Sequence, residues 1–391
     1  VFFIPIILQR QLFKSCLLYF FFMVKVAIIG GGFGGVTAAL NLIKHKNIDV
    51  TLFNKRDGFL FTPLITDVIS GKLKKKDIMY DLNKNLGRKI TIVNKEVDKV
   101  DFKNKIIYYD SEKLEYDYII IAIGAKENYF GIDGAKENCL KLKTVYGTND
   151  IQIRIQEALI DDKKENSFVV VGAGATGIEL AVEIKDRIDY YKKKTKQKSN
   201  LKVLIIDGND KILGPINNDK IRSIVMKKLL KKNIDIKFNS RVTKITKNYV
   251  EINGNEKIIT DNVFWAAGVK PNTILTEPEI VDKSGHFQVN EYLKIKGIEN
   301  AYSIGDCASF IQEDKPLPDF AQVAVKQAKI VSYNIINEIK NKNLKKFHYN
   351  SEGFILSMGN TAVAEVKGII ISGKLAWIMH KIVYSIKRIG L

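Results

Sequence analysis

Two clusters of glycines are spaced as in loops that bind the pyrophosphate of a dinucleotide. The glycines at G-x-G-x-x-G spacing are Gly30, Gly32 and Gly35 in the first cluster and Gly172, Gly174 and Gly177 in the second. The first glycine of such a loop allows a tight turn, the second lets backbone approach the pyrophosphate, and the third lets a helix pack on a strand. Two loops predict two bound dinucleotides, most simply a flavin and a nicotinamide.

The segments around each cluster are those that must position such a loop. Val24–Ile29 and Phe168–Val171 are apolar, β-branched runs, typical of strands buried on both faces of a parallel sheet. A helical pattern follows each loop, at Val36–Leu42 and at Ile178–Ala181. The N-terminus of each helix would direct its free N–H groups and positive dipole end at the phosphates.

The next strand after each loop ends in a polar residue that could read a ribose. Leu201–Ile206 ends at Asp207, whose carboxylate would accept hydrogen bonds from a ribose and repel a 2′-phosphate, so we expect NADH rather than NADPH. Asp207 could also be an ordinary loop acid. Asp49–Phe53 ends at Asn54, which could hold a ribose more weakly because its amide carries no charge.

Three further segments end near the same predicted sheet edges. Tyr118–Ile123 ends at Gly124, Ile258–Gly268 is another predicted strand, and Ala301–Ile304 precedes Gly305 and Asp306. Asp306 could accept a hydrogen bond from a ribityl hydroxyl or could simply cap a helix. The apolar segment Phe59–Leu64 could line a flavin edge or belong to the core.

The fold class predicted from this order is α/β, with two Rossmann-like domains built on parallel central sheets and a C-terminal membrane-associating segment. The predicted boundaries are an extension at 1–22, a FAD domain at 23–145 and 281–345, a NADH domain inserted at 146–280, and the C-terminal segment at 346–391.

The composition gives a net charge of +19, from 62 Lys and Arg against 43 Asp and Glu. No nucleic-acid-binding motif accompanies this charge, so we expect no nucleic-acid partner. An AT-rich coding bias or an anionic membrane surface would each explain it. Cys16, Cys139 and Cys307 have no C-x-x-C spacing, which argues against a disulfide framework or a metal site and favours a reducing cytoplasm. The four histidines are scattered without metal-ligand spacing, and we expect each of them at the surface.

Both ends of the sequence contain apolar segments that could contact a membrane. Residues 1–22 contain apolar runs, but polar residues interrupt them before they reach the roughly 18–20 residues needed to span a bilayer. We expect either that synthesis truly begins at Met23 or that these residues form a short membrane anchor. Near the C-terminus, one helical face carries Leu375, Ile378, Met379, Ile382, Ile386 and Ile389, with lysines elsewhere and Trp377 at the expected interface. Such a helix lies on a membrane or packs on a core.

These motifs together resemble the flavoproteins with two dinucleotide-binding domains, and within them the type II NADH dehydrogenases. The resemblance covers nearly all of residues 24–391, and its most specific segments are Phe59–Leu64, Asn128–Gly134 and Ala321–Gln327.

This resemblance implies non-covalent FAD at Gly30, Gly32, Gly35 and Asp306, and NADH at Gly172, Gly174, Gly177 and Asp207. Glu179 matches an acid near the contact of nicotinamide and flavin, although a helix N-terminus would also favour a carboxylate there. Gln322 and Gln327 match the pocket where quinone approaches the flavin. Further cofactor contacts are expected at Phe33, Gly34, Asn54, Pro63, Gly124, Thr176, Gly268, Gly305 and Ala321.

The activity that the resemblance implies is hydride transfer from NADH to FAD, followed by transfer of two electrons to a membrane quinone without proton pumping. The protein would lie on the cytoplasmic face of the inner membrane, held by its C-terminal basic amphipathic helix, and a homodimer is left open. One alternative is a sulfide:quinone oxidoreductase, which needs paired cysteines that Cys139 does not evidently have. A non-catalytic NADH-binding flavoprotein sensor is the other.

Overall fold

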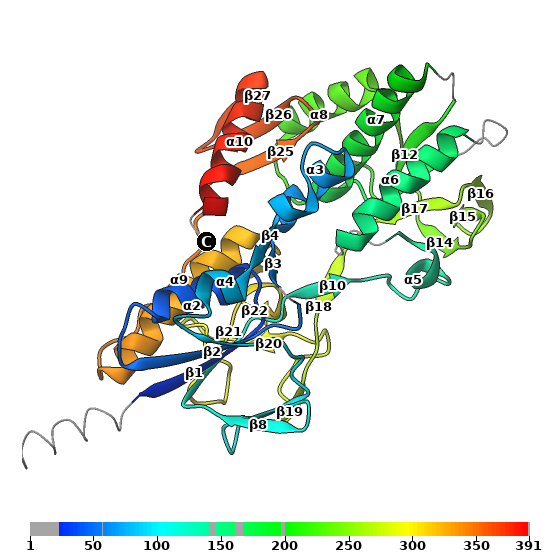
Figure 1. Cartoon of the computed structure of the whole chain (residues 1–391). Coiled ribbons are helices and arrows are strands. Elements are labelled where there is room, and N and C mark those ends of the chain that lie inside the picture. The colour runs from blue at the N-terminus through cyan, green and yellow to red at the C-terminus, as the bar shows by residue number, and fades with distance from the viewer. Residues whose placement is uncertain (1–22, 57, 141–144, 161–166, 197–199, 390–391) are drawn as a thin grey trace, which may run out of the picture. The chain divides into compact units, whose positions relative to one another are not determined.

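The computed structural model describes residues 23–56, 58–140, 145–160, 167–196 and 200–389, with residues 145–150, 160 and 385–389 described as backbone only. The extension at residues 1–22 lies outside this part of the chain. The described residues form two compact units (Figure 1). Unit 1 contains the chain up to Phe59, Tyr80–Lys126 and Lys270–Tyr349, and unit 2 contains Leu60–Met79, Glu127–Val269 and Asn350–Leu391.

Unit 1 is built on a parallel five-stranded sheet. Its strand order is β21 (Ala301–Ser303), β9 (Tyr118–Ile121), β1 (Val24–Ile29), β2 (Ile48–Phe53) and β5 (Thr91–Val93). The central strands are buried on both faces, as their unbroken apolar runs predict.

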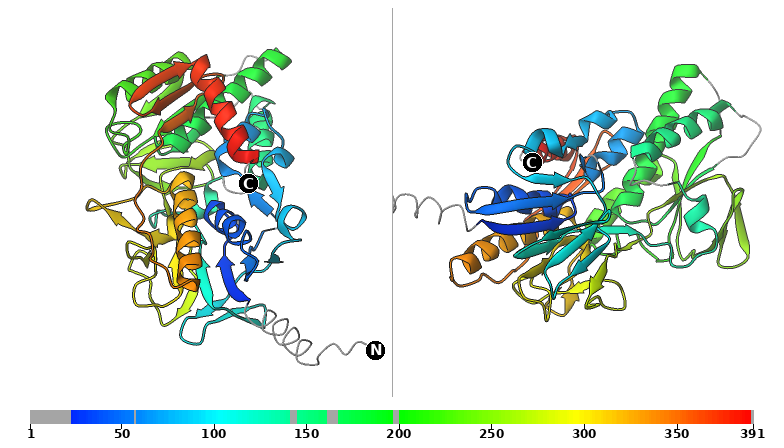
Figure 2. Two further views of the ribbon diagram at one scale, coloured as in Figure 1. Left: turned by 90° about the vertical axis from the view of Figure 1, so that its left-hand side faces the viewer. Right: turned by 60° about the horizontal axis from the view of Figure 1, so that its bottom comes forward.

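Two helices of unit 1 run beside each other although they are far apart in the sequence. Helix α2 (Phe33–Leu42) lies against α9 (Ala321–Ile339), as Figure 2 shows. A smaller sheet pairs β19 (Leu275–Glu277), β6 (Lys99–Asp101), β7 (Ile106–Tyr109) and β8 (Glu112–Glu115) in that order. Unit 1 therefore places a nucleotide-type loop, residues 30–32, between its central strand and a helix supported by α9.

Unit 2 contains a second parallel sheet. Its order is β13 (Ile234–Lys237), β12 (Lys202–Ile206), β11 (Ser167–Val171) and β17 (Asn262–Trp265). Helices α6 (Val145–Ile160), α7 (Ala175–Thr195) and α8 (Asp219–Lys231) bury apolar residues with this sheet. The opposite face packs on an antiparallel sheet of β14 (Val242–Ile245), β15 (Tyr249–Ile252) and β16 (Glu256–Ile259). The predicted α/β class with two Rossmann-like units is confirmed.

The C-terminal part of unit 2 is an antiparallel sheet covered by a helix. Strands β25 (Phe354–Ser357), β26 (Ala362–Val366) and β27 (Ile369–Gly373) pair in order, and α10 (Lys374–Ile389) packs on them through Ala376. Trp377 packs toward Ala362 and Ala364 as well and is half-buried, and its place at a membrane interface stays a prediction.

The units and strands of the structure depart from the predicted ranges in several places. Residues 60–79, which we assigned to the first nucleotide domain, form part of unit 2 because α3 (Ile65–Ile69) packs against α6 and α7. The strand predicted over 258–268 is divided, since β16 ends at Ile259 and the buried β17 begins only at Asn262.

Unit 2 buries charged side chains between its helices. Lys72 Nζ lies 2.6 Å from both carboxylate oxygens of Glu183, whose side chain is 2 % exposed. Lys381 Nζ on α10 lies 3.1 Å from Oδ2 of the buried Asp67 on α3. Because each carboxylate has left water, each depends on its lysine for compensation.

We expect Lys72→Met to lower the free energy of unfolding by about 3–5 kcal/mol, because it leaves the Glu183 carboxylate buried without a cation. Burial already raises the pKa of Glu183 and Lys72 opposes that rise, so removing Lys72 raises the pKa further. The native state then holds a proton that the unfolded state releases, and the loss should be larger at pH 8 than at pH 5.

Urea titrations at the two pH values measure this effect. The double variant Lys72→Met/Glu183→Met is the control and should recover most of the stability. Equal stability of wild type and Lys72→Met at pH 8 would contradict the prediction.

Candidate functional site

The glycine loop of unit 1 has one glycine that packs on its own backbone and one that faces open space. A Cβ added at Gly35 would lie 1.8 Å from the carbonyl oxygen of Gly30, so only glycine allows this approach. A Cβ at Gly32 would meet no atom within 4 Å. A Cβ at Gly34 would lie 3.0 Å from Ile304 Cδ1. The requirement for glycine at 32 therefore comes from outside the protein, as expected where a pyrophosphate must approach.

The loop of unit 2 repeats this arrangement. A Cβ at Gly177 would lie 1.9 Å from the carbonyl oxygen of Gly172, whereas one at Gly174 would meet nothing within 4 Å. Thr176 is exposed in the first turn of α7 beside this loop. Both loops therefore fit a dinucleotide pyrophosphate at a helix N-terminus.

Asn54 is buried at the end of β2, where it holds the glycine loop. Its Oδ1 accepts from the Gly31 N–H at 3.3 Å, and its Nδ2 donates to the carbonyls of Arg56 and Gly58 at 2.7 and 3.3 Å. The amide hydrogens are thus used within the protein. Asn54 supports the loop, and its Oδ1 is the atom that could still accept from a ribose.

Asp207 has the corresponding position in unit 2. Its Oδ2 accepts from the Ala173 N–H at 2.6 Å, and its Oδ1 accepts from the backbone and side-chain N–H groups of Asn209, both at 2.8 Å. These bonds fix the carboxylate beside the glycine loop. A negative charge held there would oppose a 2′-phosphate.

The Gly305–Asp306 turn of unit 1 is held by a buried glutamine. Gln327 on α9 is 1 % exposed, and its Oε1 accepts from the Gly305 N–H at 2.7 Å. Its carbonyl oxygen is thereby committed to the turn, a supporting role that the quinone-pocket prediction did not include. Ala321 and Gln322 lie partly exposed in the first turn of the same helix.

The remaining predicted contacts are divided between the units. In unit 1, Phe33 packs edge-on against Phe59 at 4.9 Å between ring centroids, and the Gly124 carbonyl accepts from the Asn272 N–H at 2.9 Å. Pro63 begins a short helix, η1 (Thr62–Leu64), in unit 2. Its contact with FAD stays a prediction.

Glu179 lies in the second turn of α7, in unit 2. Its Oε1 accepts from the Ser357 N–H at 2.9 Å. Loss of hydration raises the pKa of Glu179 to about 8; the Ser357 bond opposes this, and the carboxylates of Asp67 and Glu183 add to it. A carboxyl group that titrates near neutral pH can hold and release a proton during a reaction.

An aromatic and imidazole pair on α10 lies in the same part of unit 2. His380 is 1 % exposed, its Nδ1 has no hydrogen-bond partner, and its ring centroid lies 4.4 Å from that of Tyr384. Burial lowers the pKa of His380 to about 4, so the ring is neutral at pH 7. Burial also raises the pKa of Tyr384, and the charges of Glu179 and Asp67 act on it in the same direction.

These groups were missed by the sequence analysis, and the prediction that each histidine lies at the surface is wrong for His380. Lys72 and Glu183 are 111 residues apart, and Asp67 and Lys381 are 314 apart. No local spacing links such residues. The one available signal was the set of polar residues that interrupt the apolar pattern of α10.

The two described cysteines are buried thiols, one in each unit. Cys139 packs among core residues of unit 2, and burial raises its pKa to about 12. Cys307 follows Asp306 in unit 1, and burial raises its pKa as well. Because thiolates and not thiols are the reactive form, neither environment favours sulfur chemistry. No metal-ligating cluster of three His, Cys, Asp or Glu occurs among the residues the structure describes.

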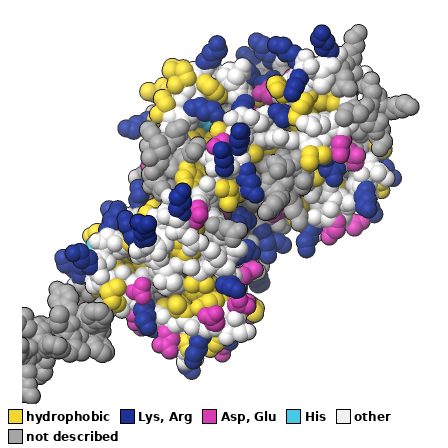
Figure 3. Space-filling view, viewed as in Figure 1, with side chains coloured by type: hydrophobic (Ala, Val, Ile, Leu, Met, Phe, Trp, Pro, Cys, Tyr) yellow, Lys and Arg dark blue, Asp and Glu magenta, His cyan; other side chains and the backbone are white. Residues whose placement is uncertain are grey.

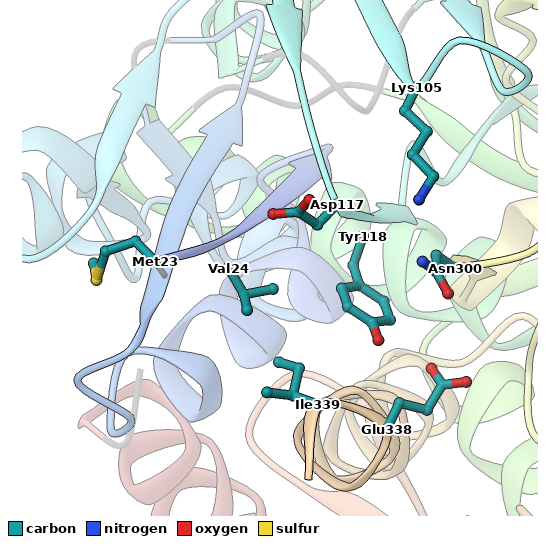
Figure 4. A pocket seen from close by; sticks show the side chains of 8 residues that line it. All are labelled: Met23, Val24, Lys105, Asp117, Tyr118, Asn300, Glu338 and Ile339. Carbon is teal, nitrogen blue, oxygen red and sulfur yellow. The ribbon is translucent and has the colours of Figure 1, made fainter. Parts of the chain in front are cut away.

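A hollow of about 540 Å³ in unit 1 is lined by the residues labelled in Figure 4. It opens at Val24, at the amino end of β1, whereas the loop follows the carboxyl end. Its acids already have partners: Asp117 accepts from the Lys25 N–H at 2.8 Å, and Glu338 pairs with Lys294. We therefore do not consider this hollow part of the dinucleotide site.

The outer face of α10 exposes apolar side chains. Leu375, Ile378 and Ile382 are 61, 48 and 53 % exposed. Ile386 and Ile389 of the predicted stripe lie outside the described side chains. Lysines and arginines are spread over the whole face seen in Figure 3, among apolar and acidic side chains. In the part of the chain that is described, no helix has both the length and the apolar character needed to cross a bilayer.

Known proteins of similar sequence match almost the whole chain. Type II NADH:quinone oxidoreductase of Staphylococcus epidermidis is 28 % identical over 94 % of this chain and 97 % of its own length. The protein of the same name from Staphylococcus aureus is 27 % identical over the same shares.

Two solved structures share the fold. NDH2 from Plasmodium falciparum in complex with NADH has a TM-score of 0.84 at 23 % identity, over 93 % of this chain and 94 % of its own. The sulfide:quinone oxidoreductase of Aquifex aeolicus has a TM-score of 0.78 at 22 % identity, over 90 % and 88 %. The family model for pyridine nucleotide-disulphide oxidoreductases matches residues 24–328. The chain therefore belongs to the pyridine nucleotide-disulphide oxidoreductase family.

Proposed function

We propose that this protein is an NADH:quinone oxidoreductase that binds FAD in unit 1 and NADH in unit 2. The observation that carries the proposal is the pair of glycine loops, each with an open second glycine at a helix N-terminus. The relatives named type II NADH:quinone oxidoreductase match 94 % of the chain and supply the reaction.

FAD held at the Gly30–Gly35 loop would supply the chemistry that links hydride transfer from NADH to two-electron reduction of the quinone, without proton movement across the membrane. The residues of this chain supply binding and proton handling. The N-termini of α2 and α7 would hold the two pyrophosphates. Asp207 would accept from the adenosine ribose of NADH and repel the extra phosphate of NADPH.

Glu179 is the group that we assign to proton transfer. Reduction of a quinone to a quinol consumes two protons, and a carboxyl group with a pKa near 8 is protonated at neutral pH. Its oxygen accepts a backbone N–H bond, which fixes the group in place. Gln322, partly exposed at the start of α9, remains our candidate for contact with the quinone.

The membrane surface is the proposed source of the quinone. Leu375, Ile378 and Ile382 on α10 would enter the interface of the cytoplasmic leaflet, with the lysines of the tail near anionic headgroups. The protein would then be peripheral.

Two alternatives are less well supported. A sulfide:quinone oxidoreductase needs reactive paired thiols, and the described cysteines are buried with raised pKa values. A non-catalytic sensor would bind NADH without reducing quinone, and kinetics separate it from the enzyme.

Anaerobic stopped-flow absorbance tests the proposed reaction. NADH should bleach the flavin rapidly after mixing, and a soluble quinone should then restore its colour. NADPH should bleach the flavin at least tenfold more slowly than NADH, because Asp207 repels the 2′-phosphate. Asp207→Asn keeps an acceptor oxygen and should reduce the difference in bleaching rate between NADH and NADPH. Asp219 is an exposed acid of the same unit, and Asp219→Asn should leave that difference unchanged. Bleaching by sulfide but not NADH would favour the first alternative, and bleaching without reoxidation the second.

Glu179→Gln should remove one pH dependence of quinone reduction. The pKa of Glu179 is raised to about 8, so the wild-type carboxyl is protonated below that pH and its donor function is lost as the pH rises through it. We expect the wild-type rate to fall above pH 8 and the variant to be slow with no inflection there. Asp189→Asn, half-exposed on the same helix, is the matched control. An unchanged inflection in Glu179→Gln would remove this residue from the mechanism.

Replacing Leu375, Ile378 and Ile382 together by Ser should weaken binding to vesicles of mixed anionic and zwitterionic lipids, measured by co-sedimentation. These positions expose apolar surface, whereas deleting α10 would also uncover Ala362 and Ala364. The control replaces Leu230, Ile259 and Leu275, which are more exposed still, by Ser. Full retention by the α10 variant would show that another surface binds the membrane.

A further inference from the structure

A tight turn in unit 2 has a phenylalanine at a position whose backbone conformation is unfavourable for a bulky side chain. The Ile132 N–H donates to the Tyr129 carbonyl at 3.0 Å, and the two residues between them have positive φ, +51° at Phe130 and +72° at Gly131. Two central residues with positive φ define a type I′ turn, which favours Asn, Asp and Gly. A bulky residue there is strained, and such strain persists where the surroundings enforce it.

The surroundings of Phe130 do enforce this conformation. Its N–H donates to Asn128 Oδ1 at 3.1 Å. Asn128 is tied to the segment after β17, since its N–H donates to the Gly268 carbonyl at 3.1 Å and its carbonyl accepts from Trp265 Nε1 at 2.8 Å. Tyr129 packs on Trp265 with ring centroids 5.5 Å apart.

The strain does not serve to bury the ring. Phe130 is 62 % exposed, while its neighbour Trp265 is 4 % exposed. The ring edge covers Gly268, where an added Cβ would lie 3.0 Å from Phe130 Cζ. A large apolar surface is thus held out to solvent by a defined network of bonds.

Gly268 and Phe130 lie on one particular side of the predicted dinucleotide site. Strand β11 lies between β12 and β17, and a dinucleotide crosses the sheet edge where the strand order reverses. Asp207, after β12, takes the adenosine half. The nicotinamide half then extends toward β17, where the loop after the strand abuts the first glycine: a Cβ at Gly172 would lie 2.6 Å from the Ala266 carbonyl oxygen.

We propose that the exposed ring of Phe130 contacts the nicotinamide half of the bound nucleotide and contributes to its affinity and placement. The inference rests on the proposed function, because it takes unit 2 to be the NADH site. Stacking of a heterocycle on an aromatic ring supplies the attraction. The turn network then has a purpose that folding alone does not give it, namely to present this ring.

Phe130→Asn tests the proposal in the FAD-loaded full chain. Asparagine suits the turn, so the variant should melt at or above the wild-type temperature. Calorimetric titration would use NAD⁺ and ADP-ribose, which differ only in the nicotinamide ring and do not reduce flavin. We expect the variant to bind NAD⁺ about tenfold more weakly and ADP-ribose with unchanged affinity.

Two further variants complete the experiment. Phe130→Trp should retain the NAD⁺ affinity, and Leu230→Asn, which removes an apolar side chain of the same 62 % exposure from α8, should change neither affinity.

Four outcomes would overturn the proposal. An equal loss of affinity for NAD⁺ and ADP-ribose in Phe130→Asn would show that the substitution acts on the part that the two probes share or on the conformation of the turn. A lower melting temperature with unchanged NAD⁺ affinity would make Phe130 a packing residue. If the wild-type protein bound neither probe, the proposed function would fail and this inference with it. If the wild-type protein bound NAD⁺ and ADP-ribose with equal affinity, only this inference would be overturned.

Discussion

The contact between the third glycine of each loop and the carbonyl of the first is the constraint on which both units depend. At Gly35 and Gly177 the first turn of the helix lies so close to the loop that a methyl group would occupy the position of the carbonyl oxygen. This approach fixes the angle between helix and strand, so that the helix N-terminus points at the open second glycine. The geometry of the nucleotide site is thus a consequence of backbone packing.

A second constraint is electrostatic and belongs to unit 2. Asp67, Glu179 and Glu183 come from two helices, and Lys72 and Lys381 provide compensating charge for Glu183 and Asp67. Glu179 receives a backbone N–H instead of a cation. Burial raises the pKa of Glu183 and of Glu179, but only Glu183 has a lysine that opposes the rise, and the pKa of Glu179 is raised to about 8.

The sequence predicted the parts of the fold that local patterns determine. The two loops and their strands follow from glycine spacing and from apolar runs buried on both faces of a sheet. The site was only partly predictable, because spacing identifies which residues stand near a ligand but not which of their atoms are already bonded. Asn54 and Gln327 show this, since their amides hold backbone in place. The ion pair of Lys381 was missed because Asp67 is distant in sequence, and the burial of His380 because it depends on how α10 packs. The role of Phe130 was missed because its turn type is invisible without φ angles.

The division of each unit into separate stretches of chain has a consequence for biosynthesis. The sheet of unit 1 begins with β1 near residue 24 but gains its edge strand β21 only at Ala301, and the helix that covers α2 ends at Ile339. The β11–β17 sheet of unit 2 is contained within Ser167–Trp265, so all of its strands leave the ribosome before β21. On a growing chain, the later sheet can therefore be complete first, while β9 keeps an unpaired edge until β21 is made and α2 stays uncovered until α9 follows.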